Sequence, residues 1–169
     1  MSDEHFSRSV VFLCDHSDEG SYGFVLNKYI TNKISEVIEG FPDIDTEISL
    51  GGPLDTSNLF YIHSLGDEIP NSLPAANGMY IGGDFDGVKD LLTRHPEKAN
   101  QIRFFIGYSG WTDDQLKGEI DEKSWIIINK MSKKEILDTT RKDIWKKILE
   151  QLGGKFKVMS KFPKNPSDN

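Results

Sequence analysis

The residues best placed to carry chemistry form the run Gly-Tyr-Ser-Gly-Trp at residues 107–111. A serine between an apolar strand and a helix is typical of the nucleophile elbow of hydrolases, which requires the pattern Gly-x-Ser-x-Gly. Here Trp111 occupies the position of the second glycine, and no spacing ties His16 or His63 to Ser109 as a general base. We therefore assign no catalytic residue, and an atypical hydrolase near Ser109 and Trp111 stays an alternative.

The turn after Ser109 also has the features of an anion-binding site. It leads into a helix that we predict from Thr112, and the free N–H groups at a helix N-terminus point toward a bound anion. Trp111 offers a flat face beside it. Thr112 and Gln115 fit a capping box, and the aspartates at 113 and 114 would repel phosphate. Plain helix capping is therefore the alternative to ligand binding at this turn.

Two further polar turns are candidates for the same ligand site. Asn27 and Lys28 close an apolar strand, and Gly51 and Gly52 precede a proline; each pair is also ordinary turn material. The candidate ligand-binding residues are Asn27, Lys28, Gly51, Gly52, Ser109, Gly110, Trp111 and Gln115. Convergence of Asn27, Lys28, Ser109 and Trp111 on one pocket would favour ligand binding.

Other motifs give weaker support for a site. The run Asp-Phe-Asp-Gly-Val at 84–88 imitates the nucleophile motif of haloacid-dehalogenase-like phosphatases, but glycines at 82 and 83 stand where strand hydrophobes belong. The aspartates are better explained as residues at the positive end of a helix. The four histidines are scattered and the lone Cys14 lies in an apolar run, so we expect no metal site and no cofactor.

Hydrophobic periodicity predicts both strands and helices along one chain, which indicates an α/β fold. The predicted strands are 9–15, 22–26, 47–50, 59–63, 79–81, 103–108 and 125–128; the predicted helices are 34–41, 84–95, 112–122 and 143–152. Five polar residues join the first two strands, which predicts an antiparallel hairpin. Strands 47–50 and 59–63 are expected to pair around the Gly-Gly-Pro turn, and 103–108 to be central because it does not alternate.

Length and composition are those of one soluble domain. At 169 residues, with 37% hydrophobic and 28% charged residues, the chain is sized for a single core, which we place at 1–162, with a disordered tail at 163–169. No apolar run is long enough to span a bilayer, and the first residues lack the basic and apolar regions of a signal peptide. With a single cysteine, these features predict a cytoplasmic protein that does not enter a membrane.

Charge is divided unevenly along the chain. Residues 1–129 hold 9 basic against 22 acidic residues, whereas residues 130–164 hold 11 against 4. An acidic body repels nucleic acid, and the sequence has no helix-turn-helix, zinc or RNA-recognition pattern. We therefore expect no sequence-specific nucleic-acid binding. The basic segment either folds back onto the acidic body, which we favour, or is offered to an anionic partner.

Four blocks in this order resemble the bacterial YqgE/AlgH family: Phe6–His16, Gly23–Lys28, Gly51–Leu54 and Gly107–Trp111 with Gln115, Leu116 and Glu119. The resemblance implies helices packed on a mixed sheet, in proteins sometimes labelled transcriptional regulators without an established activity. This chain departs from the family at Tyr29, where proline is usual, and at Asp114, where glycine is usual. Members also begin with an extra apolar strand, so we expect an open strand edge here and self-association through it.

Together these observations predict a non-enzymatic regulatory or interaction protein that works through protein partners. The basis is the lack of a complete catalytic constellation and the family resemblance. A small-ligand-binding protein or an atypical hydrolase, with its site near Ser109 and Trp111, is the alternative.

Overall fold

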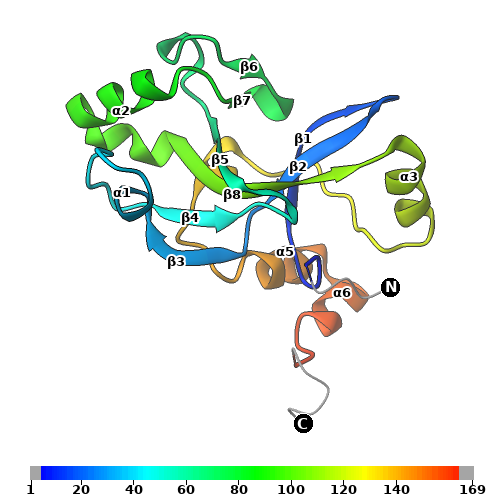
Figure 1. Ribbon diagram of the computed structural model, residues 1–169. Helices are drawn as coiled ribbons and strands as arrows, with labels where there is room; N and C mark the ends of the chain where they lie inside the picture. Colours follow the sequence, from blue (N-terminus) through cyan, green and yellow to red (C-terminus); the bar gives the residue numbers. More distant parts are fainter. Residues whose placement is uncertain (1–4, 164–169) are drawn as a thin grey trace.

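The computed structural model describes residues 5–163, which form one mixed α/β domain (Figure 1). Its strands are β1 (Val11–Ser17), β2 (Gly20–Val25), β3 (Tyr29–Lys33), β4 (Glu47–Leu50), β5 (Leu54–His63), β6 (Leu73–Pro74), β7 (Tyr80–Ile81) and β8 (Ile102–Trp111). Its α-helices are α1 (Ile34–Val37), α2 (Phe85–Arg94), α3 (Asp113–Asp121), α4 (Lys133–Leu137), α5 (Ile144–Leu152) and α6 (Gly154–Met159). The fold class expected from the sequence is confirmed, and the predicted tail beyond residue 163 lies outside the described residues.

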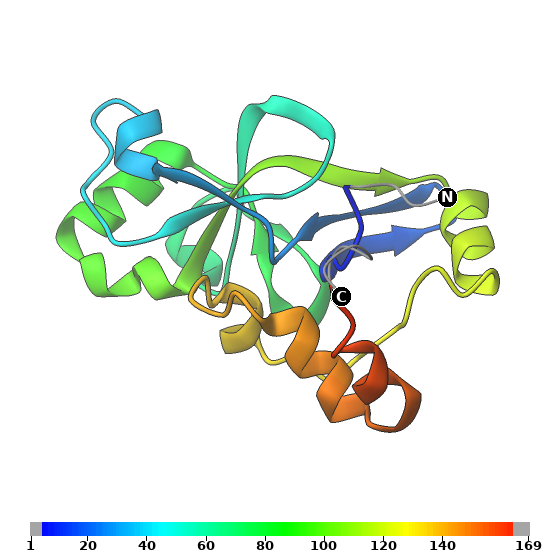
Figure 2. The ribbon, with the colours of Figure 1, turned by 90° about the horizontal axis from the view of Figure 1, so that it is seen from below.

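Strand β8 organises the sheet, whose order is β1-β2-β8-β5-β7-β6. Its C-terminal half pairs with β2, its N-terminal half pairs in parallel with β4, and β5 runs antiparallel along its other side. Strand β3 pairs with β4 at a separate edge. Seen from below, β8 crosses the molecule from the side of α2 to α3 (Figure 2). The hairpin of β1 and β2 and the central place of β8 are as the sequence predicts.

The expected pairing of 47–50 with 59–63 is wrong, because β8 lies between β4 and β5. The glycines at the turn explain how this is possible. Gly51 donates its N–H to Ile106 O at 2.8 Å, and a Cβ at Gly51 would lie 2.4 Å from Gly107 O. A Cβ at Gly52 would lie 2.3 Å from Tyr108 O. The chain therefore leaves β4 against the backbone of β8, at a separation that only glycine permits.

Three other expectations need correction. Residues 125–128 are not a strand: they pair with no strand among the described residues, and Ile127 is 71% exposed. Strand β3 went unpredicted because Thr31, Asn32 and Lys33 are polar and exposed at the edge of the sheet. The helix expected over 34–41 is a single turn, α1, with buried Ile34 as its anchor.

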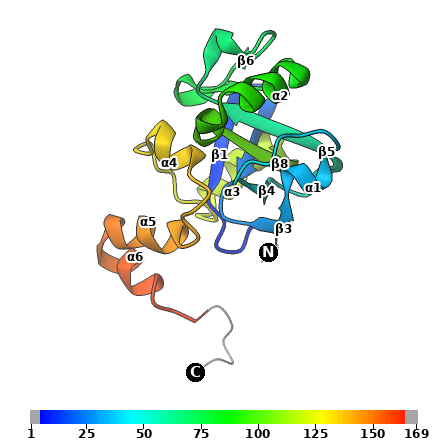
Figure 3. The same cartoon turned by 90° about the vertical axis from the view of Figure 1, so that its left-hand side faces the viewer.

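Two hydrophobic clusters lie on opposite faces of the sheet. One is built around Phe104 with α1 and α2, and the other around Phe105 with β1, β2 and α4. Successive residues of β8 thus point into different cores, which explains why this strand is apolar without alternation. Helices α4, α5 and α6 stand apart from α1 and α2 (Figure 3).

Helix α5 matches its predicted bounds, but its tryptophan is less buried than its apolar stripe suggests. Ile144 and Leu149 are buried, whereas Trp145 is only half-buried. The Arg8 guanidinium lies 5.0 Å from the centre of the Trp145 ring and donates hydrogen bonds to Phe162 O and Pro163 O. The N-terminal segment therefore anchors the end of the last helices.

Candidate functional site

An open groove of about 650 Å³ lies between the β1–β2 hairpin and strands β5, β7 and β8. Its lining residues are Asp15, Ser17, Glu19, Gly20, Ser21, Tyr22, Phe24, Leu54, Asp55, Phe60, Ile81, Tyr108, Gly110 and Trp111. This volume is in the range of pockets that hold ligands or partner side chains.

The floor of the groove is aromatic. Phe60 packs edge-to-face on Tyr108 with 5.5 Å between ring centres, and on Phe24 at 6.1 Å. Phe24 stacks on Phe105 at 4.4 Å, so the floor continues directly into the core. Because Phe60 and Tyr108 are only half-buried and are fixed by the packing beneath them, their outer faces are preorganised contact surfaces.

The rim of the groove is acidic. Asp15, Glu19 and Asp55 are exposed and line it, and none of the described lining residues carries a positive charge. Burial, followed by the nearby Cys14 and Asp15, raises the pKa of Tyr22, which therefore stays a neutral hydroxyl at the rim. An aromatic floor beneath carboxylates favours a cationic or amphipathic ligand.

Some of the predicted ligand-binding residues lie at this groove. Gly110 and Trp111 line it, whereas Ser109 points away. Ser109 is fully buried within β8 and donates its hydroxyl to Gly51 O at 3.0 Å, so its side chain ties β8 to the Gly51-Gly52 turn. The predicted capping box is not formed: the Thr112 side chain caps α3 by accepting from Gln115 N, but the Gln115 side chain donates instead to Glu119 at 3.1 Å.

Asn27 and Lys28 do not join this groove. The Asn27 side chain accepts from Val10 N at 2.8 Å and donates to Arg8 O at 2.7 Å. Lys28 donates to His5 O. Both residues thus hold the N-terminal segment in place. Asn27, Lys28, Ser109 and Trp111, whose convergence on one pocket would have favoured ligand binding, are therefore dispersed.

Trp111 is held in an aromatic cluster at the end of the groove. Its ring packs against Phe6 at 5.5 Å and Trp125 at 5.9 Å, and it is 6% exposed. Both indole N–H groups donate to the same oxygen of Glu119, at 3.1 Å from Trp111 and 2.7 Å from Trp125. The Glu119 carboxylate thus holds Trp125, which follows α3, beside Trp111.

Among residues 5–163, two contacts between serine and histidine side chains occur, and they differ in chemistry. His63 is fully buried, accepts from Leu65 N at its Nδ1 and therefore carries its proton on Nε2, which faces Ser72 and Gly82 O. This tautomer cannot take a proton from Ser72, so the contact is structural. His16 Nδ1 lies 2.7 Å from Ser21 Oγ, and Ser21 lines the groove. Only this second pair has the arrangement of a base beside a nucleophile.

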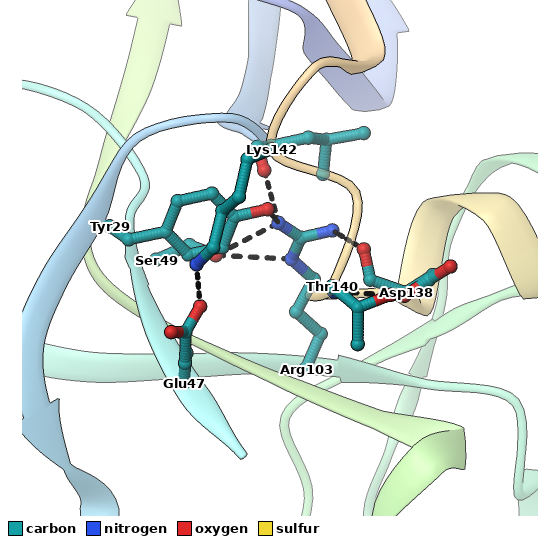
Figure 4. Close-up of polar contacts among 8 residues, drawn as sticks. Tyr29, Glu47, Ser49, Arg103, Asp138, Thr140 and Lys142 are labelled. Atoms are coloured by element: carbon teal, nitrogen blue, oxygen red, sulfur yellow. Dashed lines mark hydrogen bonds and ion pairs between the residues drawn. The ribbon is translucent and has the colours of Figure 1, made fainter.

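A buried arginine, which the sequence analysis missed, lies on the other half of β8. Arg103 is fully buried, and its guanidinium donates to Ser49 Oγ, Ile136 O, Asp138 O, Tyr29 OH and Leu26 O (Figure 4). The distances include 3.1 Å from Nε to Ser49 and 2.7 Å from Nη1 to Ile136 O. One side chain therefore joins β8 to β4, to the chain after β2 and to α4.

None of these acceptors is a carboxylate. Burial lowers the pKa of Arg103, and nearby Tyr29 opposes that effect. Burial alone would raise the pKa of Asp138, but two bonds from Thr140 outweigh it and the pKa is lowered. Lys142 lies over the Tyr29 ring at 3.5 Å and pairs with Glu47 (Figure 4). Since its N–H groups are bonded to protein oxygens, Arg103 ties α4 to the sheet and is not available to a ligand.

The described residues contain no group of three or more histidine, cysteine, aspartate or glutamate side chains placed to hold a metal ion. Within residues 5–163, every helix is too short or too polar to cross a membrane. Cys14 is buried, and burial followed by Asp15 raises the pKa of its thiol to about 12.

Comparison with known proteins identifies relatives along the whole chain. The family described as AlgH-like matches residues 1–157. A "UPF0301 protein" of Bacteroides fragilis is 42% identical over 170 residues, covering 100% of this chain and 86% of the relative. A "UPF0301 protein" of Bacteroides thetaiotaomicron is 39% identical with the same coverage.

Solved structures share the fold. The solution structure of the AlgH protein from Pseudomonas aeruginosa matches with a TM-score of 0.73 at 20% identity, over 96% of this chain and 88% of that one. A crystal structure of a Corynebacterium diphtheriae protein matches with a TM-score of 0.72 at 21% identity, over 96% and 86%. At 20–21% identity, these matches show a shared fold.

Proposed function

The chain belongs to the AlgH-like family, and from that premise we propose that it is a non-enzymatic interaction or regulatory protein whose groove binds a cationic, apolar segment of a partner protein. The observation that carries this proposal is the acidic rim of Asp15, Glu19 and Asp55 above the rings of Phe60 and Tyr108. We place this activity in the cytoplasm, in keeping with a lone cysteine that is buried and free.

The groove suits a protein segment better than a small molecule. It is open along its length and its polar groups sit at the rim, so it lacks the convergent polar contacts that orient a small ligand. A lysine or arginine over an aromatic ring gains cation–π attraction, and its apolar stem covers the floor. The rim carboxylates add long-range attraction that salt screens.

A short synthetic peptide in which lysines alternate with leucine and phenylalanine tests the proposal. Binding is followed by the fluorescence anisotropy of a dye attached to the peptide. The variant Asp15→Asn, Glu19→Gln, Asp55→Asn should weaken binding about tenfold, because three exposed charge pairs at about 0.5 kcal/mol each sum to about 1.5 kcal/mol. The matched control removes the same charge from exposed Glu39, Asp43 and Asp45, elsewhere on the surface, and should bind normally.

Equal loss of affinity in both variants would show only a general charge effect and would contradict the groove as the binding site. Binding that persists in the rim variant would do the same. A control peptide with glutamate in place of lysine should not bind.

The contact of His16 with Ser21 supports a second candidate, an atypical hydrolase that uses this groove. Ser21 Oγ would be the nucleophile and His16 the base that accepts its proton. A fluorophosphonate probe tests this directly: labelling of Ser21 that is lost in His16→Ala supports the hydrolase. An unlabelled protein leaves the binding function as the better account.

A further inference from the structure

The last helix presents an exposed face that is both apolar and cationic. Val158 and Met159, in the last turn of α6, are 56% and 40% exposed, and Phe162, just after the helix, is 59% exposed. Three lysines, at 155, 157 and 161, are exposed around this face. We call Val158, Met159, Phe162 and these three lysines the α6 face.

The α6 face is held in position by its own chain. Arg8 donates to Phe162 O at 2.9 Å and to Pro163 O at 2.5 Å, and Ser160 is buried on the opposite side of the helix. The face therefore points outward as a formed surface. In Figure 1, α6 lies at the bottom of the molecule, while the tips of β1 and β2 and strand β7, which border the groove, lie in the upper half. A chain cannot place this helix in its own groove without undocking it.

The α6 face and the groove are complementary in charge and in chemistry. Three lysines surround the apolar residues of α6, and three carboxylates surround the aromatic floor of the groove. Within the described part of the chain, the ion pair of Lys142 with Glu47 joins the basic segment to the acidic body, whereas the pairs of Arg141 and Lys147 are local. The basic segment thus contacts the acidic body through Lys142, and the lysines of the α6 face stay available for another molecule.

We propose that the partner segment bound by the groove is the α6 face of a second copy of this chain. This inference rests on the proposed function of the groove and names its occupant. Insertion of an amphipathic helix into an apolar groove is a common mode of recognition. Here Val158 and Met159 would enter the groove from the last turn of α6, and Phe162 from the chain just after it. The two surfaces are different patches, so the contact is head-to-tail and leaves one groove and one α6 face free in each pair.

Charge exchange tests this contact. One variant carries Lys155→Glu, Lys157→Glu and Lys161→Glu; the other carries Asp15→Lys, Glu19→Lys and Asp55→Asn. Asparagine is chosen at Asp55 because its φ of 50° is a left-handed conformation that asparagine tolerates. Each variant alone combines like charges and should lose self-association at least about tenfold. An equimolar mixture should regain it, since acidic α6 then meets a basic groove.

Sedimentation equilibrium over rising concentration gives the readout against a monomer of 19.1 kDa. Wild-type protein should exceed this mass at high concentration and return to it in high salt. Phe162→Ser, which removes an exposed side chain, should weaken association without altering the charge.

A wild-type chain that stays at 19.1 kDa, yet binds the lysine-rich peptide in its groove, overturns the self-recognition while the proposed function stands. A chain that binds neither overturns both. Variants that associate as strongly alone as in the mixture also contradict the inference, because charge would then not select the partner surface.

Discussion

Replacing Arg103 by methionine should destabilise the protein strongly, because this side chain fastens four elements together. Methionine fills much of the same space but donates no hydrogen bond. The acceptors left without a donor are Ser49 Oγ and the carbonyls of Leu26, Ile136 and Asp138. A buried polar group that loses its partner costs about 1–3 kcal/mol, and removing a buried charge that has no carboxylate partner returns part of that cost.

At about 1 kcal/mol for each acceptor, Arg103→Met should lower the free energy of unfolding by about 4 kcal/mol. For a domain of this size that corresponds to a fall in Tm of about 8–16 °C. Urea denaturation measures the change. Arg103→Lys should be no better tolerated, because one ammonium group cannot reach acceptors on separate elements. Hydrogen exchange should rise first in α4, whose carbonyl at Ile136 loses its donor.

Arg94 provides the matched control for this experiment. It is exposed on α2 and bonds only to Asp90 O on its own helix among the described residues, so Arg94→Met should cost under about 0.5 kcal/mol. A loss under about 1 kcal/mol for Arg103→Met would refute the idea that the guanidinium fastens α4 to the sheet. An Arg103→Lys variant as stable as wild type would show that charge, rather than the forked geometry, is what matters.

Three other predictions follow from buried groups and close backbone approaches. Burial lowers the pKa of His63 from 6.5, and its bond to Gly82 O only partly opposes this effect. The unfolded chain therefore binds a proton that the folded chain does not, so the free energy of unfolding should fall as pH drops below about 6.5. In urea melts at several pH values, His63→Gln should remove this component, whereas His95→Gln, at an exposed histidine, should not. The Cys14 thiol, with a pKa of about 12, should resist thiol reagents at pH 8 in the native protein and react fully once it is unfolded. Gly52→Ala should lower the free energy of unfolding by at least about 2 kcal/mol, because its Cβ would lie 2.3 Å from Tyr108 O. Gly118→Ala, in the interior of α3 with no atom within 4 Å of the new Cβ, should raise it by about 0.5–1 kcal/mol. Thermal melts in which both changes had the same sign would contradict the steric argument.

The sequence predicted the elements whose signal is local. The β1–β2 hairpin, α2 and α5 carry their periodicity and turn residues within a few positions, so their bounds were close. The order of strands in the sheet is nonlocal: nothing near residues 47–63 indicates that β8, some forty residues later, lies between β4 and β5. The run at 125–128 has the composition of a strand but pairs with no strand among the described residues, and Glu119 holds Trp125 beside Trp111.

The same distinction applies to the candidate site. Gly110 and Trp111 were identified because they end an obvious strand, whereas Tyr22 and Phe60 join them only through the pairing of separate strands. Arg103 gave one signal, a charge inside an apolar strand, which is best read as a buried group that needs many acceptors. Asn27 and Lys28 were polar residues at a strand end, and their bonds to Arg8 O and His5 O could not be foreseen from spacing.

The measurement that tests the central claim most directly is a titration of the lysine-rich peptide into wild-type protein, the rim variant and the control variant, at low and high salt. The account predicts saturable binding to wild type and control and about tenfold weaker binding to the rim variant, with affinity falling as salt rises. Wild-type and rim-variant proteins with the same affinity would show that Asp15, Glu19 and Asp55 do not form the binding site, and would contradict the account.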